Sequence, residues 1–151
     1  MLYGIELSVI ELSIFYLVSS KLRHNIDKLK HMDRISYYWC MFTILTMIWE
    51  IFFITGYTDV IGIANFLYYK KQHTWTTLFD ISYLLPWKFS HIFYAEYAVY
   101  ADREYMNKAE DWSRIIEGTH AIFCGLFSLL AMYQLYYNHI KKYKISIACS
   151  M

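Results

Sequence analysis

The sequence is poor in helix-breaking residues and lacks the common motifs of soluble enzymes. It has one proline and five glycines in 151 residues. It contains no HExxH metalloprotease motif, phosphate-binding P-loop, dinucleotide-binding GxGxxG or GxSxG nucleophile elbow. The three cysteines, Cys40, Cys124 and Cys149, form no CxxC pair, so neither a disulfide framework nor a redox motif is indicated. We expect them to be small apolar core residues.

An excess of charge of one sign is also absent. Fourteen Lys and Arg residues stand against thirteen Asp and Glu residues, for a net charge of +1. Nucleic acid is therefore not expected as a partner, because no basic excess is present to release counterions from phosphates. The chain is 58% hydrophobic and 18% charged, which excludes disorder and displaces the composition toward membrane proteins. Its length favours a single domain over residues 1–151.

Long apolar stretches are what the sequence has instead. Three are long enough to cross a bilayer, which takes about 20 apolar residues: residues 2–22, 35–57 and 112–137. The first has no basic start or small-residue cleavage site and carries Glu6 and Glu11, so we expect a retained helix and not a cleaved signal peptide. A further, partial apolar segment covers residues 144–151. The fold class predicted is all-α, a polytopic membrane bundle with three full transmembrane helices.

Two basic clusters predict the orientation of these helices. The connection 21–34 has five Lys and Arg residues against two acids, and Lys141, Lys142 and Lys144 follow the third apolar stretch. Three spans place both clusters on one side, and the positive-inside rule assigns that side to the cytosol. We therefore expect a multi-pass protein with a lumenal N-terminus and a cytosolic C-terminus.

The second connection, residues 58–111, is too long for a simple loop. Its part from 79 to 106 is rich in Tyr, Trp and Phe with charges interspersed, and Pro86 interrupts any helix begun near Leu78. Aromatic rings with one polar edge are typical of the headgroup interface. We expect a pair of amphipathic interfacial helices here.

Carboxylates inside the apolar stretches are the main chemical signal. Glu50 lies near the end of the second stretch and Glu117 near the start of the third, so antiparallel spans place them at similar depth. An ionisable group within a membrane helix normally faces the bundle interior and indicates a functional cavity. With His120, one turn after Glu117, they form an acid/base set for moving a proton on an apolar substrate.

Structural roles for these groups remain open alternatives. Glu117 could pair with Arg103 or Arg114 near the interface, and His120 could hydrogen-bond a neighbouring helix. Glu6 lies close enough to the terminus to reach water, and Glu11 could bond another helix.

Three short patterns carry a resemblance to a known family. The first comprises Glu50, Tyr57, Asp59 and Gly62; the second Glu96, Tyr97, Asp102 and Tyr105; the third Glu117, Gly118, Gly125, Ser128, Leu129 and Tyr133. Together they resemble the emopamil-binding protein family, the EXPERA-domain proteins, whose best-known members are sterol isomerases of the endoplasmic reticulum. That family has five membrane helices, so the resemblance implies a chain truncated at the C-terminus.

The resemblance implies a sterol isomerase that shifts the 8,9 double bond to the 7,8 position without cofactor or metal. Glu117 and His120 would be the proton-handling pair, Glu50 the second carboxylate and Thr46 an orienting hydroxyl. The substrate-binding residues would be Trp49, Phe53, Tyr57, Trp112 and Cys124. Family members usually have His four residues before the first glutamate and Thr three after the second; here Thr46 and His120 occupy these positions, with the residue types exchanged.

The implied partners are a sterol or other apolar lipid and the membrane lipids, with a homodimer among the open oligomeric states. A non-catalytic alternative of the same family is a sterol- or lipid-binding membrane protein or a trafficking chaperone. A further alternative is an ion or proton channel element, which would need Glu6, Glu11, Glu50 and Glu117 to line one path.

Overall fold

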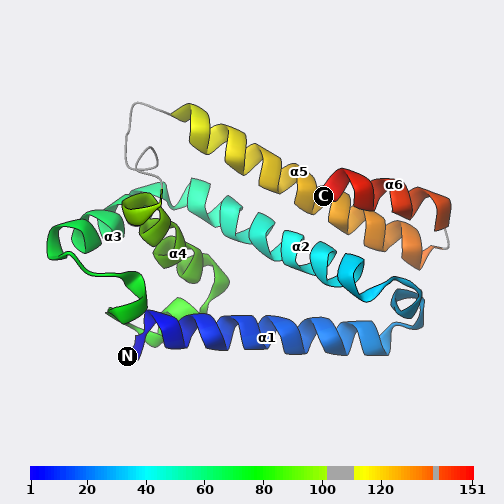
Figure 1. Cartoon of the computed structure of the whole chain (residues 1–151), viewed down its shortest axis with the longest axis horizontal. Helices are drawn as coiled ribbons and strands as arrows, with labels where there is room; N and C mark the ends of the chain where they lie inside the picture. The colour runs from blue at the N-terminus through cyan, green and yellow to red at the C-terminus, as the bar shows by residue number, and fades with distance from the viewer. Residues whose placement is uncertain (102–110, 138–139) are drawn as a thin grey trace. The chain divides into compact units, whose positions relative to one another are not determined.

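The computed structural model describes residues 1–101, 111–137 and 140–151, without the side chains of 31, 111–114, 116–117 and 140–143. These residues are almost entirely helical (Figure 1), which confirms the all-α class. The helices are α1 (Gly4–Asn25), α2 (Arg34–Thr55), α3 (Tyr57–Lys70), α4 (Pro86–Tyr100), α5 (Asp111–Tyr136) and α6 (Ile140–Ser150). The connections hold an antiparallel pair of strands, β1 (Leu2–Tyr3) and β2 (Leu78–Phe79), and three 3-10 turns, η1 (Asp27–His31), η2 (Thr74–Thr76) and η3 (Ile81–Leu84).

Two helical segments are long and apolar enough to cross a membrane, namely Arg34–Thr55 and Gly118–Tyr136. The first nearly matches the second predicted span, 35–57, and the second covers the later part of the third predicted span, 112–137. The helix α1 covers the first predicted span with 22 residues, but it is not among these candidates. Its length includes Glu6, Glu11 and the basic residues of its last turn. Two candidate spans indicate a membrane protein, and the three-span bundle stays a prediction.

The outer faces of the two candidate spans are apolar. Their exposed large side chains include Trp39, Phe42, Ile51, Ile54, Phe123, Leu126, Leu129 and Leu130. Single exposed apolar side chains are normal on water-soluble proteins, but here they recur along both candidate spans. Exposing such side chains costs less free energy in lipid than in water.

Several predicted boundaries differ from those observed. The helix α2 ends at Thr55, two residues before the predicted end, and α3 begins directly after Gly56. In the described part of the second connection the helices are α3 and α4, so one of them precedes the aromatic stretch at 79–106. Pro86, expected only to interrupt a helix, begins one at the first position of α4, where its missing N–H is not needed. The apolar segment at 144–151 falls within the end of α6.

The chain divides into two compact units, and the boundaries between them fall inside α1, α2 and α5. The first unit comprises residues 1–13 and 48–118. Its core lies where α3 packs against α4 (Figure 1). Val60, Ala64 and Leu67 recur at helical spacing and are fully buried against the small side chains of Ala95 and Ala98. Alternating large and small residues let the two helices pack closely.

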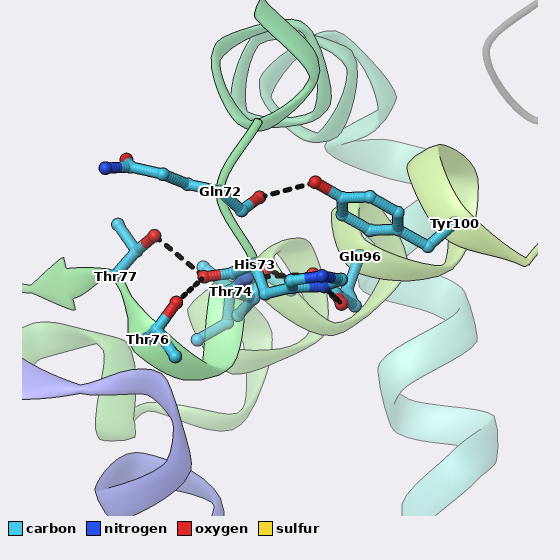
Figure 2. A network of polar contacts seen from close by, with 8 residues as sticks. Gln72, His73, Thr74, Thr76, Thr77, Glu96 and Tyr100 are labelled. Atoms are coloured by element: carbon cyan, nitrogen blue, oxygen red, sulfur yellow. Dashed lines mark hydrogen bonds and ion pairs between the residues drawn. The ribbon is translucent and has the colours of Figure 1, made fainter. Parts of the chain in front are cut away.

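A polar network fastens the segment after α3 to α4 (Figure 2). The buried Glu96 carboxylate accepts a hydrogen bond from the Thr74 backbone N–H at 2.8 Å, and its other oxygen lies 2.7 Å from His73 Nδ1. The Tyr100 ring stacks on His73 with centroids 4.1 Å apart, and its hydroxyl donates to the Gln72 carbonyl. Glu96, part of the second family-like pattern, is thus a structural residue in this unit.

The second unit comprises residues 14–47 and 119–151. Tyr37 and Cys40 of α2 are fully buried beside Ala131 of α5 and Ile147 of α6. The Tyr37 hydroxyl donates to the Ser19 carbonyl at 2.7 Å. Cys40 therefore has the core position expected from the sequence, and Cys124 is buried as well. The same expectation is wrong for Cys149, which is exposed near the end of α6.

Gly125 sets the spacing between α2 and α5 in the second unit. A Cβ added at Gly125 would lie 2.4 Å from the Cβ of Met47, an atom fixed to the backbone of α2. We predict that Gly125→Ala lowers the free energy of unfolding by about 1–3 kcal/mol through overpacking. The measurement is a denaturant titration of the detergent-solubilised protein.

Gly62→Ala is the matched control, because nothing lies within 4 Å of a Cβ at this helical glycine. It should raise the free energy of unfolding by about 0.5–1 kcal/mol. Equal effects of the two substitutions would contradict the close approach of α2 and α5.

Asp33 caps the N-terminus of α2. Its Oδ1 accepts a hydrogen bond from the Ser36 backbone N–H at 2.8 Å, and the bonds from Ser36 hold the pKa of Asp33 below its usual range. We predict that Asp33→Ala lowers stability by about 1 kcal/mol at neutral pH, whereas Asp33→Asn costs less.

The pH dependence of this cap follows from the sign of the shift. The pKa of Asp33 is lower in the folded protein than in the unfolded chain. The ionised carboxylate therefore stabilises the fold at neutral pH, and this stabilisation is lost as the pH falls through the folded pKa. Thermal melts on an acid series should show the wild type losing its advantage over Asp33→Asn. A pH-independent difference between the two proteins would contradict this account.

Candidate functional site

Glu50 is a buried carboxylate inside a candidate span. It lies on α2 with 3% of its surface exposed, and Tyr94 of α4 donates a hydrogen bond from its hydroxyl to Glu50 Oε2. Burying a carboxyl group costs free energy unless donors replace its water. The phenol of Tyr94 is such a donor, so α4 and α2 are joined at the most polar point of the span.

Aromatic rings surround this pair within the first unit. Phe53 is fully buried one turn after Glu50, and its ring stacks on that of Tyr94 with centroids 4.4 Å apart. The Tyr57 ring meets Phe53 edge to face, with centroids 5.9 Å apart. Trp49 packs against Phe89 and Phe93 of α4 with centroids 5.3 and 5.5 Å away. Three predicted substrate-binding residues, Trp49, Phe53 and Tyr57, therefore belong to the aromatic surroundings of Glu50.

The helix α5 passes close to Glu50 at a glycine. A Cβ built on Gly118 would lie 3.2 Å from Glu50 Oε1 and 2.5 Å from Ile54 Cδ1. Gly118 directly follows Glu117, the second predicted catalytic carboxylate. The side chains of Glu117 and Trp112 lie outside the described residues, so the predicted meeting of the two carboxylates stays a prediction.

The two N-terminal glutamates have structural surroundings. Glu11 is buried, and its side chain interacts with that of Trp49 on α2. Glu6 is exposed, and its Oε2 accepts a hydrogen bond from the Tyr3 backbone N–H at 2.8 Å. These positions correspond to the structural alternatives, a helix–helix contact for Glu11 and access to the surface for Glu6.

The remaining predicted site residues belong to the second unit. The Thr46 hydroxyl donates to the Thr43 carbonyl at 3.0 Å. His120 is exposed, and its ring lies 3.6 Å from the sulfur of Cys124, which is buried. The structure thus places His120 and Cys124 on one side of α5, as their four-residue spacing indicates.

A separate cavity of about 600 Å³ opens in the first unit. Its lining comes from α3, η3 and α4: Thr58, Asp59, Gly62, Ile63, Tyr83, Trp87, Lys88 and His91. Burial raises the pKa of Tyr83, with the charges of Asp59 and Asp80 acting in the same direction. Tyr83 therefore remains a neutral hydrogen-bond donor. The volume is within the range of small-molecule sites, and the lining combines aromatic, acidic and basic groups.

His91 and Tyr94 of α4 were not among the functional residues predicted from the sequence. A Cβ at Gly56 would lie 2.2 Å from His91 Nε2, so glycine leaves room for His91 at the end of α2. His91 Nε2 lies 3.3 Å from the Phe52 carbonyl oxygen. Tyr94 bonds Glu50 across 44 residues of sequence. The three-residue spacing of His91 and Tyr94 indicates that they share one side of α4, but it does not indicate which residues they contact.

Metal-binding side chains do not cluster in the described part of the chain. No group of three His, Cys, Asp or Glu residues there could hold a metal ion. The titratable side chains that line the cavity carry a carboxyl, a phenol, an imidazole and an ammonium group.

The Glu50–Tyr94 bond can be tested by its effect on stability. We predict that Tyr94→Phe lowers the free energy of unfolding by about 1–3 kcal/mol, because the buried carboxyl loses a donor. Tyr133→Phe, at an exposed position of α5, should have little effect. In a double-mutant cycle with Glu50→Leu the two losses should not add. Additive losses would show that the bond contributes nothing to stability.

Comparisons of the chain with protein-family models, with curated proteins and with solved structures found no match. The geometry of the first unit therefore carries the functional argument: a buried carboxylate, its phenol donor and their aromatic surroundings.

Proposed function

We propose that the protein is an integral membrane sterol isomerase that moves a ring double bond by protonation and deprotonation. The observation that supports this proposal is the buried Glu50 carboxyl, which is hydrogen-bonded by Tyr94 and surrounded by aromatic rings. A carboxyl group in an apolar site can act as an acid or base near neutral pH. Membrane location in the endoplasmic reticulum, with a lumenal N-terminus, is part of the proposal.

The proposed reaction conserves the composition of the substrate. One carboxyl group adds a proton to the ring alkene, and a carbocation forms on the neighbouring carbon. The faces of aromatic rings such as Trp49 and Tyr57 stabilise that cation. A carboxylate then removes a proton from the next ring carbon, and the double bond re-forms one position away. Glu117 and His120 are the proposed proton-handling pair, with Glu50 as the second carboxylate and Thr46 as an orienting hydroxyl.

A non-catalytic sterol- or lipid-binding protein is the second candidate. Two observations favour it: His120 is exposed, and the cavity beside α3 and α4 lies next to Asp59, a carboxylate at the surface. An exposed carboxylate suits a hydrogen bond to a ligand hydroxyl more than proton transfer to an alkene. In this alternative the cavity binds an amphipathic lipid and no bond changes.

Conversion of an 8,9-unsaturated sterol to the 7,8 isomer tests the enzyme proposal. The full chain, reconstituted in lipid, should convert the sterol, and Glu50→Gln or Glu117→Gln should lower the rate about 10²- to 10⁴-fold. The products are followed by chromatography and mass spectrometry. Glu6→Gln, at an exposed carboxylate, should leave the rate unchanged.

Binding without conversion would instead support the second candidate. Trp87→Ala should then weaken sterol binding, because Trp87 lines the cavity. Equal conversion by the wild type and both glutamine variants would contradict a catalytic role of the carboxylates.

A further inference from the structure

A cationic cavity lies in the second unit, between the end of α1, the turn η1 and the start of α2. Its volume is about 460 Å³, within the range of small-molecule sites. Seven residues line it: Tyr16, Ser20, Arg23, His24, Lys30, Arg34 and Tyr38. We infer that this cavity binds the phosphate group of an anionic lipid headgroup.

The arrangement of the lining residues is set by helical spacing. Tyr16, Ser20 and Arg23 recur at intervals of four and three residues on α1, so they share one face. Arg34 and Tyr38 do the same across the first turn of α2. The turn η1 brings the two helices back beside each other and adds Lys30. The three cationic side chains thus converge on one cavity although the sequence separates them.

The positive charge of the cavity is incompletely neutralised by the described residues. Lys30 pairs with Asp27 at 2.7 Å, and Asp27 is largely exposed. Asp33 is also exposed, and its Oδ1 is engaged by the Ser36 backbone N–H. No described acidic side chain forms an ion pair with Arg23 or Arg34. An anion in the cavity would therefore meet two guanidinium groups, which recognise phosphate through paired N–H donors.

Internal contacts hold one of these groups in place. Arg23 Nη2 donates to the Met32 carbonyl at 2.9 Å, and the guanidinium lies 5.7 Å from the centre of the Tyr37 ring. The hydroxyls of Ser20 and Tyr38 lie 2.9 Å apart, and the Tyr16 and Tyr38 rings stack. Arg23 is thus oriented before a ligand arrives, which lowers the entropic cost of binding.

The position of the cavity favours a lipid as the source of the phosphate. Arg34 is the first residue of a candidate span, so in a membrane the cavity would lie at the level of the headgroups. Tyrosine side chains are typical of that interface. Basic pockets between helices on the cytoplasmic side bind phosphorylated headgroups of lipids. A phospholipid could place its phosphate in the cavity and its acyl chains against the apolar faces of the helices.

Thermal stabilisation by short-chain phosphatidic acid tests the site. The full chain in a zwitterionic detergent should show a rise in melting temperature that saturates with this lipid, and short-chain phosphatidylcholine should give none. Arg34→Gln should weaken the apparent affinity at least about tenfold, because a charge-assisted hydrogen bond is lost.

Lys21→Gln is the matched control, since it removes one positive charge from the same basic segment without lining the cavity. Its affinity should change much less than that of Arg34→Gln. Equal weakening by both variants would overturn the proposal, because it would show a general electrostatic effect and no built site.

Arg23→Gln provides a second test. Its melting temperature without lipid first confirms that the variant folds, and its apparent affinity for phosphatidic acid is then measured as for Arg34→Gln. Inorganic phosphate alone separates the two sources of the ligand. Weak or absent stabilisation by phosphate supports a lipid headgroup, whereas stabilisation equal to that by phosphatidic acid would overturn the lipid assignment.

Discussion

The burial of the Glu50 carboxyl group constrains the first unit more than any other feature. A carboxylate in the last turns of an apolar helix needs donors that replace water, and Tyr94 supplies one from α4. The stacked ring of Phe53 then fixes the phenol, and Gly118 leaves room for the carboxyl group beside α5. The residues that pack closely around Glu50 are therefore also the ones that satisfy its hydrogen-bonding need.

The same constraint connects the fold to the proposed chemistry. A carboxyl group that reaches water would titrate as an ordinary acid, whereas one in an apolar site can exchange a proton with an apolar substrate. The aromatic residues that exclude water from Glu50 are also those that could stabilise a carbocation. The cavity beside Asp59 has a volume of about 600 Å³, whereas the proton transfer that we propose involves the buried Glu50 carboxyl group.

Charge is organised differently in the second unit. The basic residues of the connection 21–34 predict an orientation by their number alone, but their arrangement adds a cavity. Arg23 and Arg34 lie on different helices, and the turn η1 brings them to one site. The segment whose charge predicts an orientation is thus also the one that we propose to hold the phosphate of a lipid at the interface.

The sequence by itself determined the helical class and the location of the long helices. Apolar runs without proline gave α2 and α5 almost at their predicted bounds, because these signals are local. The pattern at 120 and 124 also predicted that His120 and Cys124 share one side of α5.

Tertiary structure alone decided which groups meet. The bonds from Tyr94 to Glu50 and from Thr74 to Glu96 join residues far apart in the chain, and no local pattern specifies such a partner. The need for glycine at position 56 likewise comes from the close approach of His91 of α4. Local propensity and periodicity act over a few turns of helix, whereas the surroundings of a buried carboxylate depend on how separate helices pack.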